Sequence, residues 1–263
     1  MSLESFVEAP TVVEPRLVLS LEGRHRSGKT HFALTAPKPL VYFPFDRGLS
    51  QDFVVSKFSA DGGGIYVPPE DFCLPPVPYP LDKDDLDKYR KKMAREAQLV
   101  WTRFMQSWER ALEGAKTIVI DTASEQWELL RLARFGKLTQ VMPHHYTEVN
   151  SEYKSLLNMI NESDANLILI HQLKEEWQDR VDASGQKKGS KTGQWVRAGF
   201  TKIDYLLHST LRLACSPDGD FSAEVMDCHQ NTDLMGDVLD GPMCSFPMFA
   251  CQVFPDSDPD EWL

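Results

Sequence analysis

The stretch from Arg16 to Thr35 reads Arg-Leu-Val-Leu-Ser-Leu-Glu-Gly-Arg-His-Arg-Ser-Gly-Lys-Thr-His-Phe-Ala-Leu-Thr. It passes from an apolar segment through a glycine loop into a segment of helical character. The loop fits the pattern G-x-x-x-x-G-K-S/T, with Gly23, Gly28, Lys29 and Thr30 at its fixed positions. In such a loop the backbone N–H groups converge on one point, where the β-phosphate of a nucleotide can bind. The stretch therefore predicts a strand, a phosphate-binding loop and a helix.

The polar side chains of this loop have expected roles in nucleotide chemistry. Lys29 would reach the β- and γ-phosphates and assist transfer of the γ-phosphoryl group, and Thr30 would offer its hydroxyl to Mg²⁺. We expect the nucleotide to contact the whole loop and the start of the helix. The residues expected at this contact are Gly23, Arg24, His25, Arg26, Ser27, Gly28, Lys29, Thr30 and His31.

Composition limits the classes of partner. The chain has 263 residues, with 28 Lys and Arg against 39 Asp and Glu, and a formal net charge of −11. Its surface as a whole repels nucleic acid, so any contact with DNA needs a local basic patch. The five cysteines show no metal-binding spacing, which indicates reduced thiols. With neither a signal-peptide pattern nor about 18 consecutive apolar residues, we expect a cytoplasmic protein with no membrane partner.

A second apolar segment, residues 39–48, predicts a buried strand that ends at Asp46. In open parallel sheets ligands bind beyond the carboxyl ends of the strands, so Asp46 would face the same crevice as the phosphate loop. Asp46 is therefore a candidate general base, or the residue that positions the attacking water. The alternative is an ordinary turn-initiating aspartate, since Asp is common in glycine turns.

A third apolar segment, residues 116–122, ends in an acid at Asp121, the pattern of a Walker B strand. Asp121 would bind the Mg²⁺ shell from the side opposite Thr30. Glu125 follows on the turn into a helical segment and is the second candidate for activating water.

A fourth buried strand is predicted at residues 166–172, and it brings His171 and Gln172 to the same edge. Either side chain could contact the γ-phosphate and sense its loss. The alternative is a pair of polar residues whose hydrogen bonds are satisfied at the end of a strand.

Between the second and third strands, residues 59–82 are rich in glycine and proline and predict an irregular insertion. Apolar residues at three- and four-residue steps then predict a long amphipathic helix over residues 86–112. Its aromatic side chains are expected in the core.

Residues 184–202 carry five cations, four glycines and no acid, which suggests a basic glycine loop. Trp195 or Phe200 could stack on a base, as in single-strand binders. Two alternatives are a solvated flexible loop and a loop that covers the nucleotide or touches a neighbouring subunit. The cations that could bind phosphates are Lys187, Lys188, Lys191, Arg197 and Lys202.

Alternating residues over 208–231, interrupted by a turn at 216–220, predict a β-hairpin. The order of phosphate loop, strand ending in Asp46, Walker B strand, strand ending in Gln172, basic loop and hairpin resembles the RecA-type ATPase core. More narrowly, it resembles phage-encoded nucleotide-binding proteins of that core associated with single-strand annealing and recombination. The resemblance implies an α/β, RecA-like P-loop fold with a mainly parallel sheet, flanking helices and a C-terminal β-hairpin.

The same resemblance implies ATP as ligand, an active site at a subunit interface and single-stranded DNA as partner. It also implies self-association into a ring or filament, and a single-strand-binding or other recombination protein as a further partner. Asp46 falls where RecA proteins carry a catalytic glutamate, Gln172 near their nucleotide-sensing glutamine, and residues 184–202 near their second DNA-binding loop. Two departures, Asp at 46 and His229 where a partner-activating lysine is expected, argue against fast hydrolysis.

The expected organisation is a loose lead-in (1–14), a RecA-like domain (15–231) with an insertion at 59–113, and a C-terminal segment (232–263). The acidic tail from Phe254 is expected to be disordered. A docking peptide, or a brake that competes with DNA for the basic loop, is the sharper alternative.

Two functions remain open. One is an ATPase that acts on single-stranded DNA, and the other is a nucleotide-switched binding or loading protein with little or no hydrolysis. A small-molecule phosphotransferase is less favoured because no arginine-bearing lid follows the loop.

Overall fold

The computed structural model describes residues 15–46, 51–60, 62–74, 78–80, 82, 85–136, 141–181 and 187–263. Its α-helices are α1 (Lys29–Leu34), α2 (Gln51–Ala60), α3 (Leu86–Gly114), α4 (Ala123–Phe135), α5 (Tyr146–Asn158) and α6 (Phe246–Val253). Its strands are β1 (Val18–Gly23), β2 (Leu40–Pro44), β3 (Ile65–Tyr66), β4 (Thr117–Asp121), β5 (Asn166–Val181), β6 (Lys187–Arg197), β7 (Ser209–Cys215), β8 (Phe221–Cys228) and β9 (Val238–Asp240). The expected lead-in, residues 1–14, lies outside the described residues.

The strands form a mostly parallel central sheet in the order β3-β2-β4-β5-β1-β7-β8-β9. β1 pairs in parallel with β5 on one side and with β7 on the other. The register aligns the carboxyl ends of the central strands, with Gly23 opposite Gln172 and Asp121 opposite Pro44. The predicted strand ends therefore lie along one edge of the sheet.

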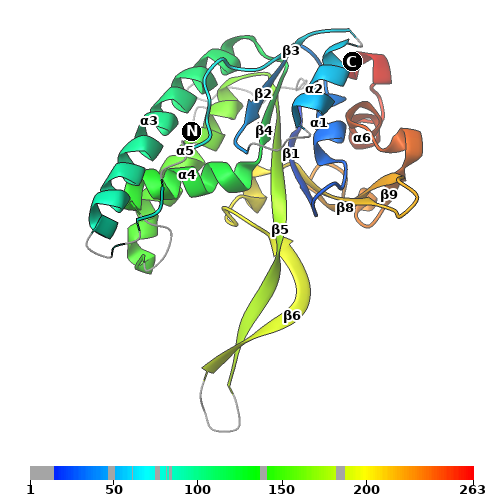
Figure 1. The fold of residues 1–263 in the computed structure, drawn as a ribbon. Helices are drawn as coiled ribbons and strands as arrows, with labels where there is room; N and C mark the ends of the chain where they lie inside the picture. Colours follow the sequence, from blue (N-terminus) through cyan, green and yellow to red (C-terminus); the bar gives the residue numbers. More distant parts are fainter. Residues whose placement is uncertain are drawn as a thin grey trace, which may run out of the picture.

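Helices cover both faces of the sheet (Figure 1), and an apolar core lies on each face. One core joins α3, α4 and α5 to one face, and the other joins α1, α2 and α6 to the opposite face. β1 and β4 are buried along their whole length, because each is covered on both sides. This explains why β4 is apolar from Ile118 to Ile120 and why the polar residues of β1, Ser20 and Glu22, are buried with hydrogen-bond partners. The α/β fold with a mainly parallel sheet and flanking helices is thus confirmed.

The long amphipathic helix is also confirmed. α3 buries Phe104 and Trp108, which contact Phe43 of β2 through their rings. α3 falls within the segment expected to be an insertion, and it contributes to the same core as β2 and β4.

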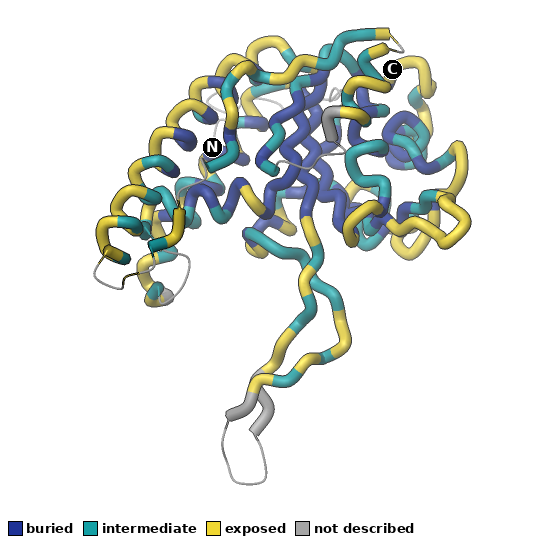
Figure 2. The backbone as a smooth tube through the Cα atoms, in the orientation of Figure 1, coloured by how far each residue is buried: buried dark blue, intermediate teal, exposed yellow. Residues whose placement is uncertain are grey.

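The prediction of a loop at 184–202 was wrong for residues 187–197, which form β6. β5 continues past Gln172, leaves the central sheet and pairs antiparallel with β6, from Leu173 opposite Arg197 to Val181 opposite Lys187. These two arms, β5 from Leu173 together with β6, are called the ribbon below. The ribbon projects from the domain in Figure 1, and its described side chains are exposed or half-buried in Figure 2.

The hairpin at 208–231 is confirmed as β7 and β8, and β9 adds a further antiparallel strand. The prediction of a disordered acidic tail was wrong. Trp262 is 4% exposed and packs on Phe246 and Phe254, with ring centroids 5.9 and 5.7 Å apart. Its Nε1 donates a hydrogen bond to Ser257 Oγ at 2.9 Å. The C-terminus lies at the end of the molecule opposite the ribbon, so the tail does not lie over the basic residues (Figure 1).

Candidate functional site

The phosphate loop follows β1 directly, and both of its fixed glycines are required by close contacts. A Cβ at Gly23 would lie 2.3 Å from Ser27 Oγ and 2.7 Å from the Leu213 carbonyl oxygen. Gly28 has φ +86°, and a Cβ there would lie 2.5 Å from the Phe221 ring. The left-handed region disfavours side chains, so the second glycine is doubly required. The backbone at both positions therefore packs too closely against Ser27, Leu213 and Phe221 to carry a side chain, which is why the two fixed positions of the motif are glycines.

The remaining loop residues take distinct places. Arg24, His25 and Arg26 are exposed, whereas Ser27 is buried. Arg26 has φ +60°, a conformation that is uncommon outside glycine. His31 lies in the first turn of α1 between two rings, edge-on to Phe58 at 4.9 Å and stacked on Phe221 at 5.8 Å.

The Lys29 side chain lies against the loop itself. Its Nζ donates hydrogen bonds to the carbonyl oxygens of Gly23 at 3.0 Å and Arg24 at 2.6 Å. Burial lowers the pKa of Lys29, and the negative charges of Asp121 and Asp46 oppose that shift. The ammonium group thus lies among the loop carbonyls and close to two carboxylates that end neighbouring strands.

Thr30 and Asp121 meet at the edge of the sheet. Thr30 Oγ1 donates a hydrogen bond to Asp121 Oδ2 at 2.7 Å, and Tyr42 donates its hydroxyl to the same oxygen at 2.8 Å. Asp121 is 2% exposed, and burial raises its pKa to about 6, against the opposing hydrogen bonds from Thr30 and Tyr42. The predicted Walker A hydroxyl and Walker B carboxylate therefore lie side by side. The peptide bond from Asp121 to Thr122 is cis.

Sequence reasoning missed Tyr42. The residue could have been found from the sequence, because it is a tyrosine in an otherwise apolar strand and the hydroxyl of a buried tyrosine needs a hydrogen-bond partner.

Asp46 and Glu125 both line a hollow of about 360 Å³ beside this pair. Asp46 follows β2, and its charge acts on Lys29, Asp121 and Glu125. Burial raises the pKa of Glu125, and the charges of Glu128 and Asp46 add to that shift. The rest of the hollow is mainly apolar, formed by Phe45, Phe72, Leu74, Leu129 and Leu132 together with Cys73 and Glu128. The geometry thus brings both candidate water-activating groups to the strand end.

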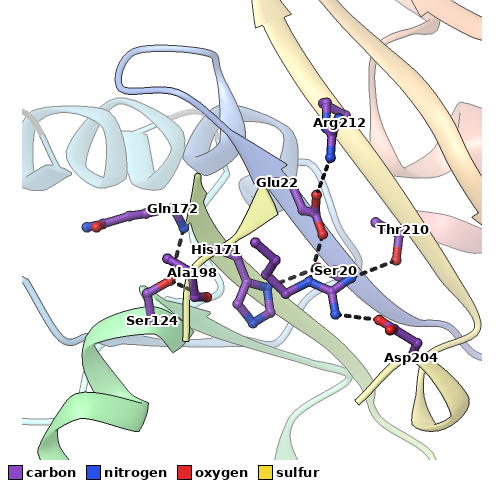
Figure 3. Close-up of polar contacts among 10 residues, drawn as sticks. Ser20, Glu22, Ser124, His171, Gln172, Ala198, Asp204, Thr210 and Arg212 are labelled. Atoms are coloured by element: carbon purple, nitrogen blue, oxygen red, sulfur yellow. Dashed lines mark hydrogen bonds and ion pairs between the residues drawn. The ribbon is translucent and has the colours of Figure 1, made fainter. Parts of the chain in front are cut away.

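His171 and Gln172 diverge, as successive residues of a strand must, and Figure 3 shows their side chains pointing in different directions. His171 is fully buried, and its Nδ1 lies 2.9 Å from Ser20 Oγ. Burial lowers the pKa of His171 well below its usual value, and the charge of Arg197 acts in the same direction. Gln172 is exposed at the sheet edge. Of the two, only Gln172 is placed where it could contact a ligand, which corrects the prediction for His171.

Ser124 connects Gln172, where β5 leaves the central sheet, to Ala198, which follows β6. Its Oγ accepts a hydrogen bond from the Gln172 N–H at 3.1 Å and donates one to the Ala198 carbonyl oxygen at 3.0 Å. The Walker B helix α4, which begins one residue before Ser124, is thereby tied to both arms of the ribbon (Figure 3).

A buried ion cluster lies at the root of the ribbon. Glu22 is 3% exposed and accepts hydrogen bonds from Arg197 at 2.7 Å and Arg212 at 3.0 Å (Figure 3). Arg197 also pairs with Asp204 at 2.6 Å. A buried carboxylate needs such partners, because an uncompensated buried charge is strongly destabilising.

Two residues expected to contact DNA are therefore structural. The Arg197 side chain is 10% exposed and engaged by Glu22, so it is removed from the predicted DNA-binding set. Phe200 is 3% exposed and packs between Trp127 and Tyr153, so its ring cannot stack on a base. The sequence around Arg197 and Phe200 did not indicate that they are buried, because the residues that bury them, Glu22 and Trp127, are distant in the chain.

The other residues of the basic stretch lie on the ribbon. Lys191 forms an ion pair with Glu175, and its Nζ lies 5.5 Å from the centroid of the Trp177 ring. Trp195 is half-buried, and the Arg24 guanidinium carbon lies 4.2 Å from its ring centroid. The side chains of Lys187 and Lys188 lie outside the described residues, although their backbone belongs to β6.

The donor set fits Mg²⁺. Within the described residues, no group of three or more His, Cys, Asp or Glu side chains could hold a metal ion by itself. Mg²⁺ in nucleotide sites is bound by one or two protein oxygens together with phosphates and waters. The Thr30 and Asp121 oxygens supply that number. Over the same described ranges, no helix is long and apolar enough to cross a membrane.

Comparison with known proteins agrees with this geometry. A search of curated proteins finds no match. A family model described as an AAA domain matches residues 16–218, which include the phosphate loop, Asp121 and the ribbon. That span covers most of the chain, and the protein belongs to this family of P-loop ATPase-type AAA domains.

Proposed function

We propose that this protein binds ATP with Mg²⁺, hydrolyses it and acts on single-stranded DNA in recombination or annealing, in a phage or its bacterial host. The observation that carries the nucleotide part is the hydrogen bond between Thr30 Oγ1 and Asp121 Oδ2 beside the glycine loop. A hydroxyl and a carboxylate at that distance, next to a loop with the sequence of a phosphate-binding loop, are the protein ligands that a magnesium nucleotide needs.

Each residue then has a role. Lys29 leaves the loop carbonyls to contact the β- and γ-phosphates, and Thr30 and Asp121 hold Mg²⁺. When bound, Mg²⁺ would neutralise charge on the phosphate oxygens. Gln172, exposed where β5 leaves the central sheet, contacts the γ-phosphate side of the site.

Asp46 is the proposed general base, and Glu125 is the second candidate. Asp46 follows β2, the strand next to β4, and acts electrostatically on both Lys29 and Asp121. Glu125 borders the same hollow, and its raised pKa brings it closer to the range of a useful base.

The ribbon is the proposed contact for single-stranded DNA, through Lys187, Lys188 and Lys191. A projecting two-stranded arm that carries these three lysines, of which Lys191 is exposed, would supply the local basic surface that DNA binding by a chain of net charge −11 needs. Assembly into a ring or filament, and a single-strand-binding or other recombination protein as partner, complete the proposal.

A nucleotide-switched binding protein with little hydrolysis is the second candidate, and one contact favours it. Arg24 belongs to the phosphate loop, yet its guanidinium lies over Trp195 of the ribbon. A nucleotide that attracts Arg24 to its phosphates would release Trp195, so nucleotide binding alone could change the ribbon.

ATP turnover measured with and without single-stranded DNA at several salt concentrations separates these functions. Turnover that rises with DNA supports the ATPase. ATP binding that changes DNA affinity without turnover supports the switch, and failure to bind ATP contradicts both.

A further inference from the structure

Trp177 is an exposed tryptophan on the ribbon that plays no part in the core. It lies on the β5 arm, and 60% of its surface is exposed. Two residues of β6 approach its ring. Lys191 Nζ lies 5.5 Å from the ring centroid, and a Cβ on Gly189 would lie 3.7 Å from the ring edge. Exposing a large apolar ring to water costs free energy that burial would recover. The position of Trp177 on a projecting arm therefore suggests that a partner covers the ring.

The other aromatic residues of this part of the chain are already engaged. Arg24 covers a face of Trp195, and Phe200 is buried against Trp127 and Tyr153. Trp177 is therefore the aromatic side chain that the described ribbon presents most openly to solvent.

The surroundings of Trp177 favour a nucleic-acid occupant. Residues 173–202 contain seven Lys or Arg and four Asp or Glu, in a chain whose net charge is −11. A protein-docking surface needs a contiguous apolar patch of several hundred Å². A single ring with an ammonium group beside it instead matches the stacking platforms of single-strand binders, in which an aromatic face takes the base and a nearby cation takes the phosphate.

We propose that Trp177 is a base-stacking site for single-stranded DNA, and that Lys191 exchanges its ion pair with Glu175 for the phosphate next to the stacked base. This inference rests on the proposed function, because it names a contact with the partner proposed there. It replaces Trp195 and Phe200, the aromatic residues that the sequence suggested, with one that the sequence did not single out.

The test is a titration of the full chain with a fluorescent single-stranded oligonucleotide, followed by anisotropy. Trp177→Ala should weaken binding about 5- to 150-fold, the equivalent of about 1 to 3 kcal/mol for one stacked base. Trp177→Phe should restore most of the affinity, since the smaller ring still stacks. Tyr66→Ala is the matched control, because Tyr66 is also 60% exposed but lies on β3, an edge strand of the central sheet, at the end of the molecule away from the ribbon (Figure 1).

Three outcomes are distinguishable. If the parent protein binds the oligonucleotide and Trp177→Ala binds it equally well, the stacking site is wrong and the proposed function stands. If the parent binds ATP but no oligonucleotide, the DNA partner and the stacking site both fall. Weaker binding by Trp177→Ala, with restored binding by Trp177→Phe, unchanged binding by Tyr66→Ala and unchanged ATP affinity, supports the assignment.

Discussion

Thr30 and Asp121 are 91 positions apart in the chain, and a hydrogen bond of 2.7 Å joins their side-chain oxygens. One ends the phosphate loop and the other ends β4, so the fold places a hydroxyl and a carboxylate where a single cation can contact both. Because Tyr42 donates to the same carboxylate oxygen, the position of Asp121 is fixed from two sides.

Lys29→Ala should abolish nucleotide binding and leave the fold intact. The Lys29 ammonium contacts loop carbonyl oxygens and not the apolar core, so its loss removes phosphate contacts and little packing. Binding of a fluorescent ATP analogue measures the effect, and circular dichroism checks the fold. Lys116→Ala, an exposed lysine at the opposite end of the sheet, is the control. Unchanged ATP affinity in Lys29→Ala would remove the basis of the proposed site.

Asp121→Asn and Asp46→Asn should separate binding from turnover. Loss of the Asp121 carboxylate should weaken Mg²⁺-nucleotide binding, since a metal ligand acts in the ground state. Asp46→Asn should spare binding and slow turnover, because a water-positioning group acts in the transition state. Steady-state kinetics together with equilibrium binding give the two effects. If Asp46→Asn hydrolyses ATP at the parent rate, the base is Glu125 or another residue.

Replacing Lys187, Lys188 and Lys191 with alanine should flatten the salt dependence of DNA binding. Each phosphate contacted on a single strand contributes about 0.7 to the slope of log K against log salt, so three lost contacts would lower it by about 2. Anisotropy titrations at several salt concentrations measure the slope. Lys88, Lys91 and Lys92 on α3 give a control variant with the same change in charge. An unchanged slope in the ribbon variant would exclude these lysines as the DNA site.

Trp262→Ala should destabilise the protein by about 3 to 5 kcal/mol, the usual cost of removing a buried tryptophan. The ring is 4% exposed and packs on Phe246 and Phe254. Deletion of Leu263, which is 65% exposed, should have almost no effect. Chemical denaturation of the two variants makes the comparison. Tighter DNA binding on removal of the tail, expected if the tail were a brake, is no longer predicted.

Stability should depend on pH through His171. Burial holds the pKa of His171 well below its usual value, so the folded ring stays neutral while the unfolded chain takes up a proton below about pH 6.5. The unfolded state then binds more protons, so the free energy of unfolding should fall as pH decreases, by up to about 1.4 kcal/mol per unit from this group.

The measurement is the free energy of unfolding of the parent and of His171→Gln over pH 5 to 8. The prediction is a difference between the slopes of these two pH dependences. Other titrating groups contribute equally to the pH dependence of both proteins. One of them is Asp121, whose pKa is raised to about 6 in the folded state and whose contribution to stability therefore grows as pH decreases. His144→Gln, with an exposed histidine replaced, should keep the parent slope. Equal slopes in all three proteins would contradict the assignment to His171.

The sequence was most informative where a local pattern is compatible with only one kind of structure. Gly23, Gly28 and Lys29 form a motif with fixed spacing, and buried parallel strands such as β4 leave continuous apolar runs. Asp121 could be placed because the carboxyl end of a strand in an α/β sheet meets the phosphate loop.

The sequence was least informative where burial depends on partners distant in the chain. Arg197 and Phe200 have the composition of a nucleic-acid loop, but Glu22 and Trp127 engage them from elsewhere in the fold. Trp262 sits in an acidic, proline-containing tail whose composition indicates disorder, and its burial depends on rings of α6 and Phe254. Trp177 gave no signal, since an exposed and a buried tryptophan look alike in a strand.

The continuity of β5 has a consequence for how this protein can change during evolution. One strand of 16 residues serves both the central sheet and the ribbon, and its pairing with β1 ends at Gln172. Two residues inserted into each arm beyond that point would lengthen the ribbon by about 7 Å and preserve the side-chain alternation. No residue of the phosphate loop or of the Glu22 cluster would need to alter. The reach of the ribbon can therefore diverge between relatives while the nucleotide site stays the same.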